Sequence, residues 1–209
     1  MKRALFLDRD GTLVEPRHYP SCPEDLVLSP EIGPLLRMFQ TSGWELVVVT
    51  NQSGIARGFF TEHDLECMHD RLREMLRVWG VDLSAIVFCP HHVDGAVPHL
   101  AIPCSCRKPQ PGMLLEVAAA REIDLTRSWM VGDILDDVEA GNRAGCQTVL
   151  VDLGTEQCPN HTGRWPRMVA RSTADALRYI AVAEDLLPVS SAPSPVVPRA
   201  WYSAAAAVH

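Results

Sequence analysis

The sequence lacks both a cluster of basic residues and a long apolar run. Its 209 residues carry 26 acidic and 19 basic side chains, for a net charge of −7, and no Lys/Arg-rich or basic aromatic stretch occurs. Nucleic-acid binding is therefore not indicated. The apolar run that follows Met1–Arg3 ends at Asp8, and no stretch approaches the roughly 18 apolar residues that span a membrane. We expect a cytoplasmic monomer that binds neither a membrane nor nucleic acid.

The cysteine pattern of a secreted, disulfide-bonded protein is also missing. Seven cysteines occur, and four of them are expected to be free thiols. Those four are Cys22, Cys67, Cys146 and Cys158. The other three lie near a histidine in two pairs, and 12 residues separate the pairs. This second group consists of Cys89, His91, Cys104 and Cys106.

Three sulfur ligands and one imidazole form a complete tetrahedral set, which favours zinc. Four protein ligands leave no open coordination position, so we expect the zinc to be structural. On spacing alone, His92 competes with His91 for the fourth position. Arg107 and Lys108 follow the last cysteine directly, where their charges would offset the excess negative charge of three thiolates.

Two carboxylates stand two residues apart after the apolar run Ala4–Leu7, in the segment Asp8-Arg9-Asp10-Gly11-Thr12. A short apolar run without alternation predicts a parallel strand that is covered on both faces. In an extended chain Asp8 and Asp10 project to the same side, and ligands bind at the carboxyl ends of such strands. Two facing carboxylates repel each other unless a hard cation such as Mg²⁺ lies between them.

Three further segments place polar groups at the boundary of a predicted element. The first ends the β-branched run Glu45–Val49 with a hydroxyl and two amides, the second puts two cations ahead of a helix, and the third adds carboxylates after a strand. In chain order these side chains are Thr50, Asn51, Gln52 and Ser53, then Arg107 and Lys108, then Asp133, Asp136 and Asp137. A hydroxyl and cations are suited to phosphate oxygens, and Asp133 is a candidate metal ligand.

In this order the four segments resemble the signature motifs of the haloacid dehalogenase superfamily of phosphohydrolases, over about residues 3–153. The run Thr50–Gly58 and the two cysteine-containing pairs narrow the resemblance to one branch. That branch contains the D-glycero-D-manno-heptose-1,7-bisphosphate 7-phosphatases of activated-heptose (lipopolysaccharide precursor) biosynthesis and, as relatives, the histidinol-phosphate phosphatases. The long segment between the pairs resembles the heptose enzymes more closely.

Alternatives remain open at this point. Ile134 stands where heptose phosphatases often place a Lys that contacts the substrate, so histidinol phosphate or another small sugar phosphate is the alternative substrate. A catalytically inactive scaffold on the same fold is the alternative that is not an enzyme. Every expected catalytic side chain is present, which favours the enzyme.

The resemblance implies a role for each motif residue. Asp8 is the nucleophile that forms an aspartyl-phosphate, and Asp10 is the general acid and base. Thr50 and Lys108 hold the phosphoryl group, while Mg²⁺ is bound by Asp8, the backbone carbonyl of Asp10, and Asp133. The substrate pocket is expected to include further side chains, namely Arg9, His18, Tyr19, Asn51, Gln52, Ser53 and Arg107. Asp137 either orients Lys108 or a metal-bound water, or serves as a helix N-terminal acid.

The pattern of elements predicts an α/β fold with a doubly wound parallel sheet, similar to the haloacid dehalogenase core. Strands are expected at 3–7, 45–49, 85–89, 128–131 and 147–151, with helices near 31–42, 61–78, 112–121, 137–144 and 173–187. The gaps between the motifs leave no room for a separate cap domain. We expect one phosphatase domain at 1–187, with the zinc loop as part of its pocket wall, and a disordered tail at 188–209.

Overall fold

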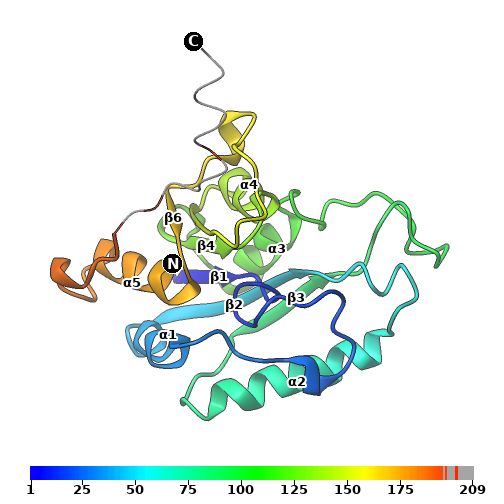
Figure 1. The fold of residues 1–209 in the computed structure, drawn as a ribbon, viewed down its shortest axis with the longest axis horizontal. Helices are drawn as coiled ribbons and strands as arrows, with labels where there is room; N and C mark the ends of the chain where they lie inside the picture. Colours follow the sequence, from blue (N-terminus) through cyan, green and yellow to red (C-terminus); the bar gives the residue numbers. More distant parts are fainter. Residues whose placement is uncertain (195, 197–200, 202–209) are drawn as a thin grey trace.

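The computed structural model describes residues 1–194, 196 and 201, and its centre is one six-stranded parallel sheet (Figure 1). The strand order is β3-β2-β1-β4-β5-β6. The strands are β1 (Arg3–Leu7), β2 (Trp44–Asn51), β3 (Ala85–Cys89), β4 (Trp129–Gly132), β5 (Gln147–Val151) and β6 (Met168–Ala170). The predicted doubly wound parallel sheet is therefore confirmed. The short strand β6 was not predicted, because three residues carry too little pattern to be recognised.

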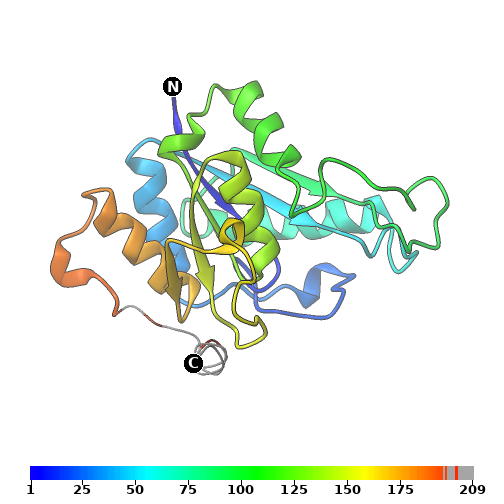
Figure 2. The ribbon, with the colours of Figure 1, turned by 90° about the horizontal axis from the view of Figure 1, so that it is seen from above.

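Helices cover both faces of the sheet, as Figures 1 and 2 show. They are α1 (Ile32–Thr41), α2 (Glu62–Arg77), α3 (Gly112–Arg121), α4 (Leu135–Ala144) and α5 (Thr173–Ala183). Alternate residues of β1 serve the two faces: Leu5 packs in the core formed with α1, α2 and α5, while Phe6 packs in the core formed with α3 and α4. No helix in the described part of the chain is both long enough and apolar enough to cross a membrane.

Three loops meet at the carboxyl edge of β1, β2 and β3. The first follows β1 and contains the 3₁₀ turn Pro23–Asp25, the second joins β2 to α2, and the third follows β3 and contains both cysteine pairs. The third loop, residues 89–106, is called the zinc loop below. It extends away from the sheet in Figure 2. In the described residues these connections are loops and short turns rather than a separate cap domain, as predicted.

Direct contacts join the three loops. The amide of Val97 in the zinc loop donates to the carbonyl of Ala56 at 2.9 Å. In turn, the ring of Tyr19 lies edge-on to Phe59, with 4.8 Å between the ring centroids. The loops therefore form one connected rim around the ends of the strands.

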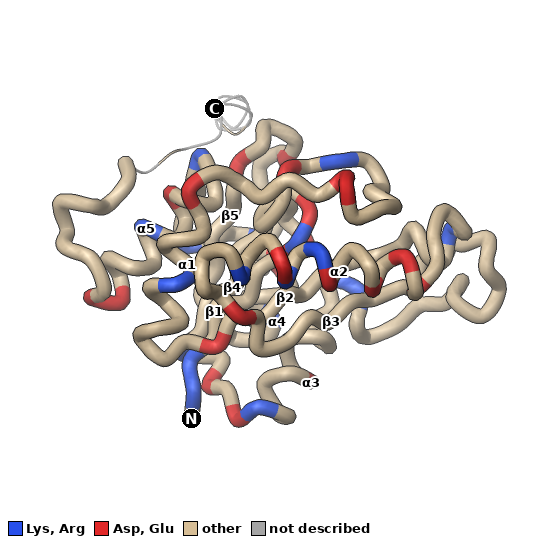
Figure 3. Tube along the Cα trace, turned by 90° about the horizontal axis from the view of Figure 1, so that it is seen from below, with Lys and Arg blue, Asp and Glu red and all other residues tan. Residues whose placement is uncertain are grey.

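Lys and Arg positions are interspersed with Asp and Glu positions along the chain rather than collected on one element (Figure 3).

The segment predicted as a tail, 188–209, lies partly outside the described residues. Among the residues that are described, 189–191 form a 3₁₀ turn. The side chain of Trp201 is buried beside Leu135 and Val138, with its ring 5.4 Å from that of Trp165. The boundary at residue 187 and the disorder of the tail stay predictions.

Candidate active site

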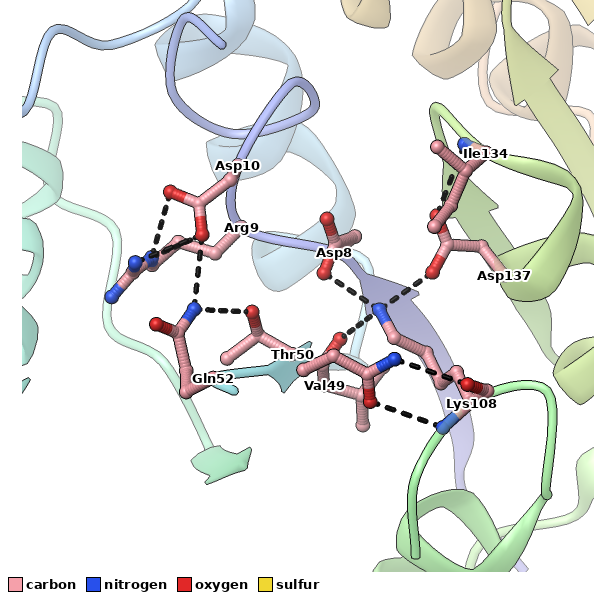
Figure 4. A network of polar contacts seen from close by, with 10 residues as sticks. Asp8, Arg9, Asp10, Val49, Thr50, Gln52, Lys108, Ile134 and Asp137 are labelled. Carbon is pink, nitrogen blue, oxygen red and sulfur yellow. Dashed lines mark hydrogen bonds and ion pairs between the residues drawn. The ribbon is translucent and has the colours of Figure 1, made fainter. Parts of the chain in front are cut away.

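A lysine amine lies between two buried carboxylates at the strand ends (Figure 4). Lys108 Nζ donates to Asp8 Oδ1 at 2.6 Å and forms an ion pair with Asp137 Oδ1 at 2.5 Å. A third contact, 2.9 Å long, joins Nζ to the carbonyl oxygen of Val49. Although burial lowers the pKa of Lys108, the charges of Asp137 and Asp8 raise it above its usual value. The amine is therefore a fixed positive charge beside Asp8.

Three carboxylates converge next to this amine. Ligand oxygens of Asp8, Asp133 and Asp137 all lie within 4.8 Å of one another. Burial raises the pKa of Asp8 to about 7 against the opposing charge of Lys108, and the charges of Asp137 and Asp10 add to the rise. Burial and the charges of Asp8 and Asp137 likewise raise the pKa of Asp133 to about 8. A divalent cation would relieve this repulsion, and an all-oxygen donor set suits Mg²⁺.

Glycine is required where the first motif turns past this cluster. Gly11 has φ +81°, and a Cβ added to it would lie 2.3 Å from Asp133 Oδ2. The backbone turn and the carboxylate can therefore lie this close together only because Gly11 has no side chain. The close approach brings the end of β1 against the end of β4.

The carboxylate of Asp10 points toward Arg9 and Gln52 rather than toward Lys108 (Figure 4). Arg9, which is fully buried, donates to it through Nε at 3.1 Å and Nη2 at 2.8 Å. Gln52 Nε2 donates both to Asp10 Oδ2 and to the hydroxyl of Thr50, each at 2.9 Å. Arg9 and Gln52, which were predicted to contact substrate, thus hold Asp10 in this structure. The role of the Asp10 backbone carbonyl as a metal ligand stays a prediction.

Asn51 also contacts a neighbouring site residue. Its amide nitrogen donates to the carbonyl of Lys108 at 3.1 Å, and its amide oxygen accepts from the Lys108 amide at 3.0 Å. This paired contact fixes the backbone that carries the lysine. Asp137 combines both of its predicted roles, because it pairs with Lys108 and also accepts from the Ile134 amide at the start of α4.

The four residues of the predicted zinc set converge in the zinc loop. The sulfur of Cys106 lies 3.1 Å from that of Cys89 and 3.2 Å from that of Cys104, and 3.4 Å from Nδ1 of His91. His92 turns elsewhere, toward the guanidinium of Arg57 at 3.0 Å. Three sulfurs and one imidazole that converge in this way could hold a tetrahedral zinc ion, with His91 as the nitrogen ligand.

Arg107 is anchored to the four-residue zinc set. Its backbone amide donates to Cys104 Sγ at 3.4 Å, and its Nη1 donates to the carbonyl of His91 at 3.3 Å. A cavity of about 250 Å³ lies beside it and is lined in part by Lys108 and Asp136. The zinc set therefore helps to fix the position of Arg107, whose side chain lines the cavity.

The remaining predicted pocket residues lie on the other two loops of the rim. His18 stacks edge-on against Tyr19 at 4.5 Å, and Tyr19 contacts Phe59. Ser53 is buried, and its carbonyl accepts from the Arg57 amide at 3.0 Å. The structure does not place these side chains in the cavity beside Arg107.

Two features of the site were not predicted. The carbonyl of Val49 binds Lys108, but every residue has a carbonyl, so no sequence signal marks this one. Asp136 lines the cavity beside Arg107, and Arg164 donates to it from a distant loop. Asp136 belongs to the fourth motif, whereas nothing in the sequence indicates that Arg164 is its partner.

Known proteins are similar to this chain in sequence. A family model described as HAD-hydrolase-like matches residues 105–176. The chain is 40% identical over 142 residues to D-glycero-beta-D-manno-heptose-1,7-bisphosphate 7-phosphatase of Rhodopseudomonas palustris, covering 68% of this chain and 79% of the relative. The Escherichia coli K12 protein of the same name is 42% identical over 157 residues, covering 75% and 82%.

Solved structures agree. A putative HAD-like phosphatase of Mesorhizobium loti has a TM-score of 0.77 and 41% identity, covering 88% of this chain and 87% of the other. D,D-heptose 1,7-bisphosphate phosphatase of B. bronchiseptica, complexed with magnesium and phosphate, has a TM-score of 0.72 and 30% identity, covering 87% and 99%. On these similarities and on the motifs at its strand ends, the chain belongs to the haloacid dehalogenase-like family of phosphatases.

Proposed function

We propose that the protein is a Mg²⁺-dependent phosphomonoester hydrolase that removes the 7-phosphate of D-glycero-D-manno-heptose 1,7-bisphosphate. The observation that carries the chemistry is the contact of Lys108 with Asp8 and Asp137, inside a cluster of buried carboxylates. The names of relatives at about 40% identity support the substrate. We further propose that the protein acts as a cytoplasmic monomer.

Asp8 is the proposed nucleophile. Lys108 holds Oδ1, so Oδ2 is left to attack phosphorus in line with the departing sugar oxygen. The Asp8 O–P bond forms as the sugar O–P bond breaks, giving an aspartyl-phosphate and an alcohol. Lys108 neutralises the charge of the transferring phosphoryl oxygens, and the hydroxyl of Thr50 binds one of them.

Asp10 is the proposed proton carrier. It follows Asp8 at the same strand end, where Arg9 and Gln52 hold its side chain. It gives a proton to the leaving sugar oxygen, and it then takes a proton from the water whose oxygen attacks the phosphorus of the aspartyl-phosphate. That second step releases inorganic phosphate and restores the Asp8 carboxylate.

Each metal has a separate proposed role. Asp8, the backbone carbonyl of Asp10 and Asp133 would hold Mg²⁺, which supplies positive charge to the phosphoryl oxygens when it is bound. The zinc set of Cys89, His91, Cys104 and Cys106 would hold a structural Zn²⁺. The zinc ligands keep Arg107 in place, and Arg107 binds the second phosphate of the substrate.

Steady-state kinetics with several phosphate esters test this proposal. We expect the highest kcat/KM with heptose 1,7-bisphosphate, and lower values with fructose 1,6-bisphosphate and histidinol phosphate. The two anomers of the heptose substrate should be assayed separately. A higher kcat/KM with histidinol phosphate would assign the enzyme to the related activity, whereas no turnover of any ester with Mg²⁺ would indicate an inactive scaffold.

A further inference from the structure

The cavity beside Lys108 has charges of both signs on its walls. Its volume is about 250 Å³, and it lies between the zinc loop and the first turn of α4. Arg107 lines it from the segment that follows the zinc set, and Asp136 lines it from α4. A phosphate group would be attracted to the first and repelled by the second. Arg107 and Asp136 are therefore suited to different parts of one ligand.

The carboxylate of Asp136 is fixed by an arginine from a distant part of the chain. Arg164 Nη2 donates to Asp136 Oδ1, and Arg164 Nε also forms an ion pair with Glu139 at 3.3 Å. The turn that carries Arg164 is tied to α4, because Asn142 Nδ2 donates to the carbonyl of Gly163 at 2.9 Å. Asp136 is thus held in one orientation before any ligand binds.

One oxygen of this carboxylate is left for a ligand. Arg164 occupies Oδ1, and no donor among residues 1–194, 196 and 201 occupies Oδ2. The Asp136 side chain is 36% exposed, so it is neither shielded from a ligand nor fully in solvent. An ionised carboxylate only accepts hydrogen bonds, and the groups of a sugar phosphate that donate them are its hydroxyls.

We propose that Asp136 is a specificity-determining residue that accepts a hydrogen bond from a hydroxyl of the sugar, in the cavity that the anion-binding Arg107 also lines. The inference deepens the proposed function and rests on it. Arg164 acts as a positioning residue, since it fixes the carboxylate and does not itself line the cavity.

A helix N-terminal acid offers a competing explanation, because a negative charge in the first turn stabilises a helix wherever it lies. Asp175 is a matched control for that role. It stands in the first turn of α5 and pairs with Arg178 at 3.2 Å, but it does not line this cavity. A purely helical role predicts similar behaviour for Asp136→Asn and Asp175→Asn.

The test compares a sugar substrate with one that has no hydroxyl groups. For the wild type, Asp136→Asn and Asp175→Asn, kcat/KM is measured with heptose 1,7-bisphosphate and with p-nitrophenyl phosphate. We expect Asp136→Asn to lower the ratio of kcat/KM for heptose 1,7-bisphosphate to kcat/KM for p-nitrophenyl phosphate. The decrease should be on the order of 10- to 100-fold, the loss expected for a hydrogen bond to a charged group. Asp175→Asn should leave the ratio unchanged. An unchanged ratio in Asp136→Asn would overturn the inference.

Arg164→Gln provides a second measurement that leaves Asp136 and α4 intact. It should lower the same ratio by a smaller factor, about 3- to 10-fold, because the carboxylate stays but is less well fixed. An unchanged ratio would overturn the positioning role. The wild-type rates test the proposed function separately, since that function fails if another sugar phosphate is the better substrate. In that case the ratios measured for the variants with that other sugar phosphate still test the role of Asp136.

Discussion

At the scale of single residues, one amine organises the site. Lys108 Nζ contacts Asp8, Asp137 and the carbonyl of Val49, all at 2.5–2.9 Å. A buried charge is tolerated only when partners surround it. Asp8 directly follows β1, Val49 lies within β2, and Asp137 lies in the helix that follows β4. The lysine therefore fixes the relative positions of β1, β2 and β4 at the point where we propose that phosphate binds.

We predict that Asp8→Asn lowers kcat by about 10⁴-fold or more, because it removes the nucleophile while keeping the shape of the side chain. The measurement is phosphate release under saturating Mg²⁺, with circular dichroism to verify the fold. Asp70→Asn, an exposed substitution on α2, is the control. Substantial activity in a clean preparation of Asp8→Asn would remove Asp8 from the nucleophilic role.

We predict that Gly11→Ala raises the Mg²⁺ concentration for half-maximal activity by roughly 10-fold or more, because the new Cβ would displace the Asp133 carboxylate. Gly43→Ala is a matched control: Gly43 also has φ +81°, but a Cβ there meets nothing within 4 Å. Both variants share the cost of a left-handed alanine, about 1 kcal/mol. Equal Mg²⁺ dependence in the two variants would show that Asp133 does not bind the metal.

The residues that were predicted from the sequence are those whose side-chain chemistry is distinctive. Asp8 and Asp133 carry charges directly after strands, and Lys108 carries one just before a helix, at positions where a charge has few purely structural uses. Spacing alone left His91 and His92 as competing ligands, and the choice depends on the direction of the chain after Cys89, which turns His92 toward Arg57. Contacts that depend on backbone atoms leave no trace in the sequence.

At the scale of elements, the zinc loop connects the zinc set to the cavity beside Arg107, where we propose that the substrate binds. Arg107 donates both to a sulfur of Cys104 and to the carbonyl of His91. The loop has no helix or strand of its own between β3 and α3, and its backbone hydrogen bonds are those of turns, such as the bond from the His92 amide to the Leu100 carbonyl at 3.2 Å. A bound metal would add rigidity to these turns.

We predict that Cys104→Ser loses the zinc ion, lowers the melting temperature and raises KM for the bisphosphate, because Arg107 is no longer anchored. Metal analysis of protein purified without chelator measures the zinc. Cys22→Ser, an exposed cysteine outside the zinc set, is the control and should keep its zinc. Within the loop, His91→Ala should lose zinc and His92→Ala should retain it; the reverse result would exchange the two histidines.

Helix α2 carries a buried histidine that links stability to pH. His69 lies against Phe88 with 5.9 Å between ring centroids, and burial, together with the charges of Arg9 and Arg73, lowers its pKa to about 3. The folded protein therefore keeps His69 neutral at a pH at which the unfolded chain binds a proton, below about 6.5. The protein should lose stability as the pH falls from about 6.5 toward 3.

We predict that His69→Leu reduces the loss of unfolding free energy between pH 7 and pH 5 by about 2 kcal/mol. This value corresponds to one histidine whose unfolded-state pKa of about 6.5 lies about 1.5 units above pH 5. The free energy of unfolding, measured with urea at both pH values, gives the difference. His63→Leu, an exposed substitution on the same helix, should retain the wild-type pH dependence. If the unfolding free energy of His69→Leu changed with pH as much as that of the wild type, His69 would be protonated in the folded state.

At the scale of the whole molecule, the parallel sheet determines where the site lies. All six strands point the same way, so residues 8, 50, 108 and 133 meet at one edge although they are far apart in the chain. Alternating apolar runs and helical patterns were enough to predict this arrangement. The position of Trp201 against α4 was not predicted, because an aromatic residue in a proline-rich segment does not indicate where it packs.

Regioselectivity tests the central claim most directly. We would follow the reaction with D-glycero-D-manno-heptose 1,7-bisphosphate by ³¹P NMR, with Asp8→Asn as the blank. The account predicts that the resonance of the phosphate on the primary carbon is replaced by that of inorganic phosphate, while the anomeric phosphate remains on the product. Release of the anomeric phosphate, or no release at all by the Mg²⁺-loaded wild type, would contradict the account.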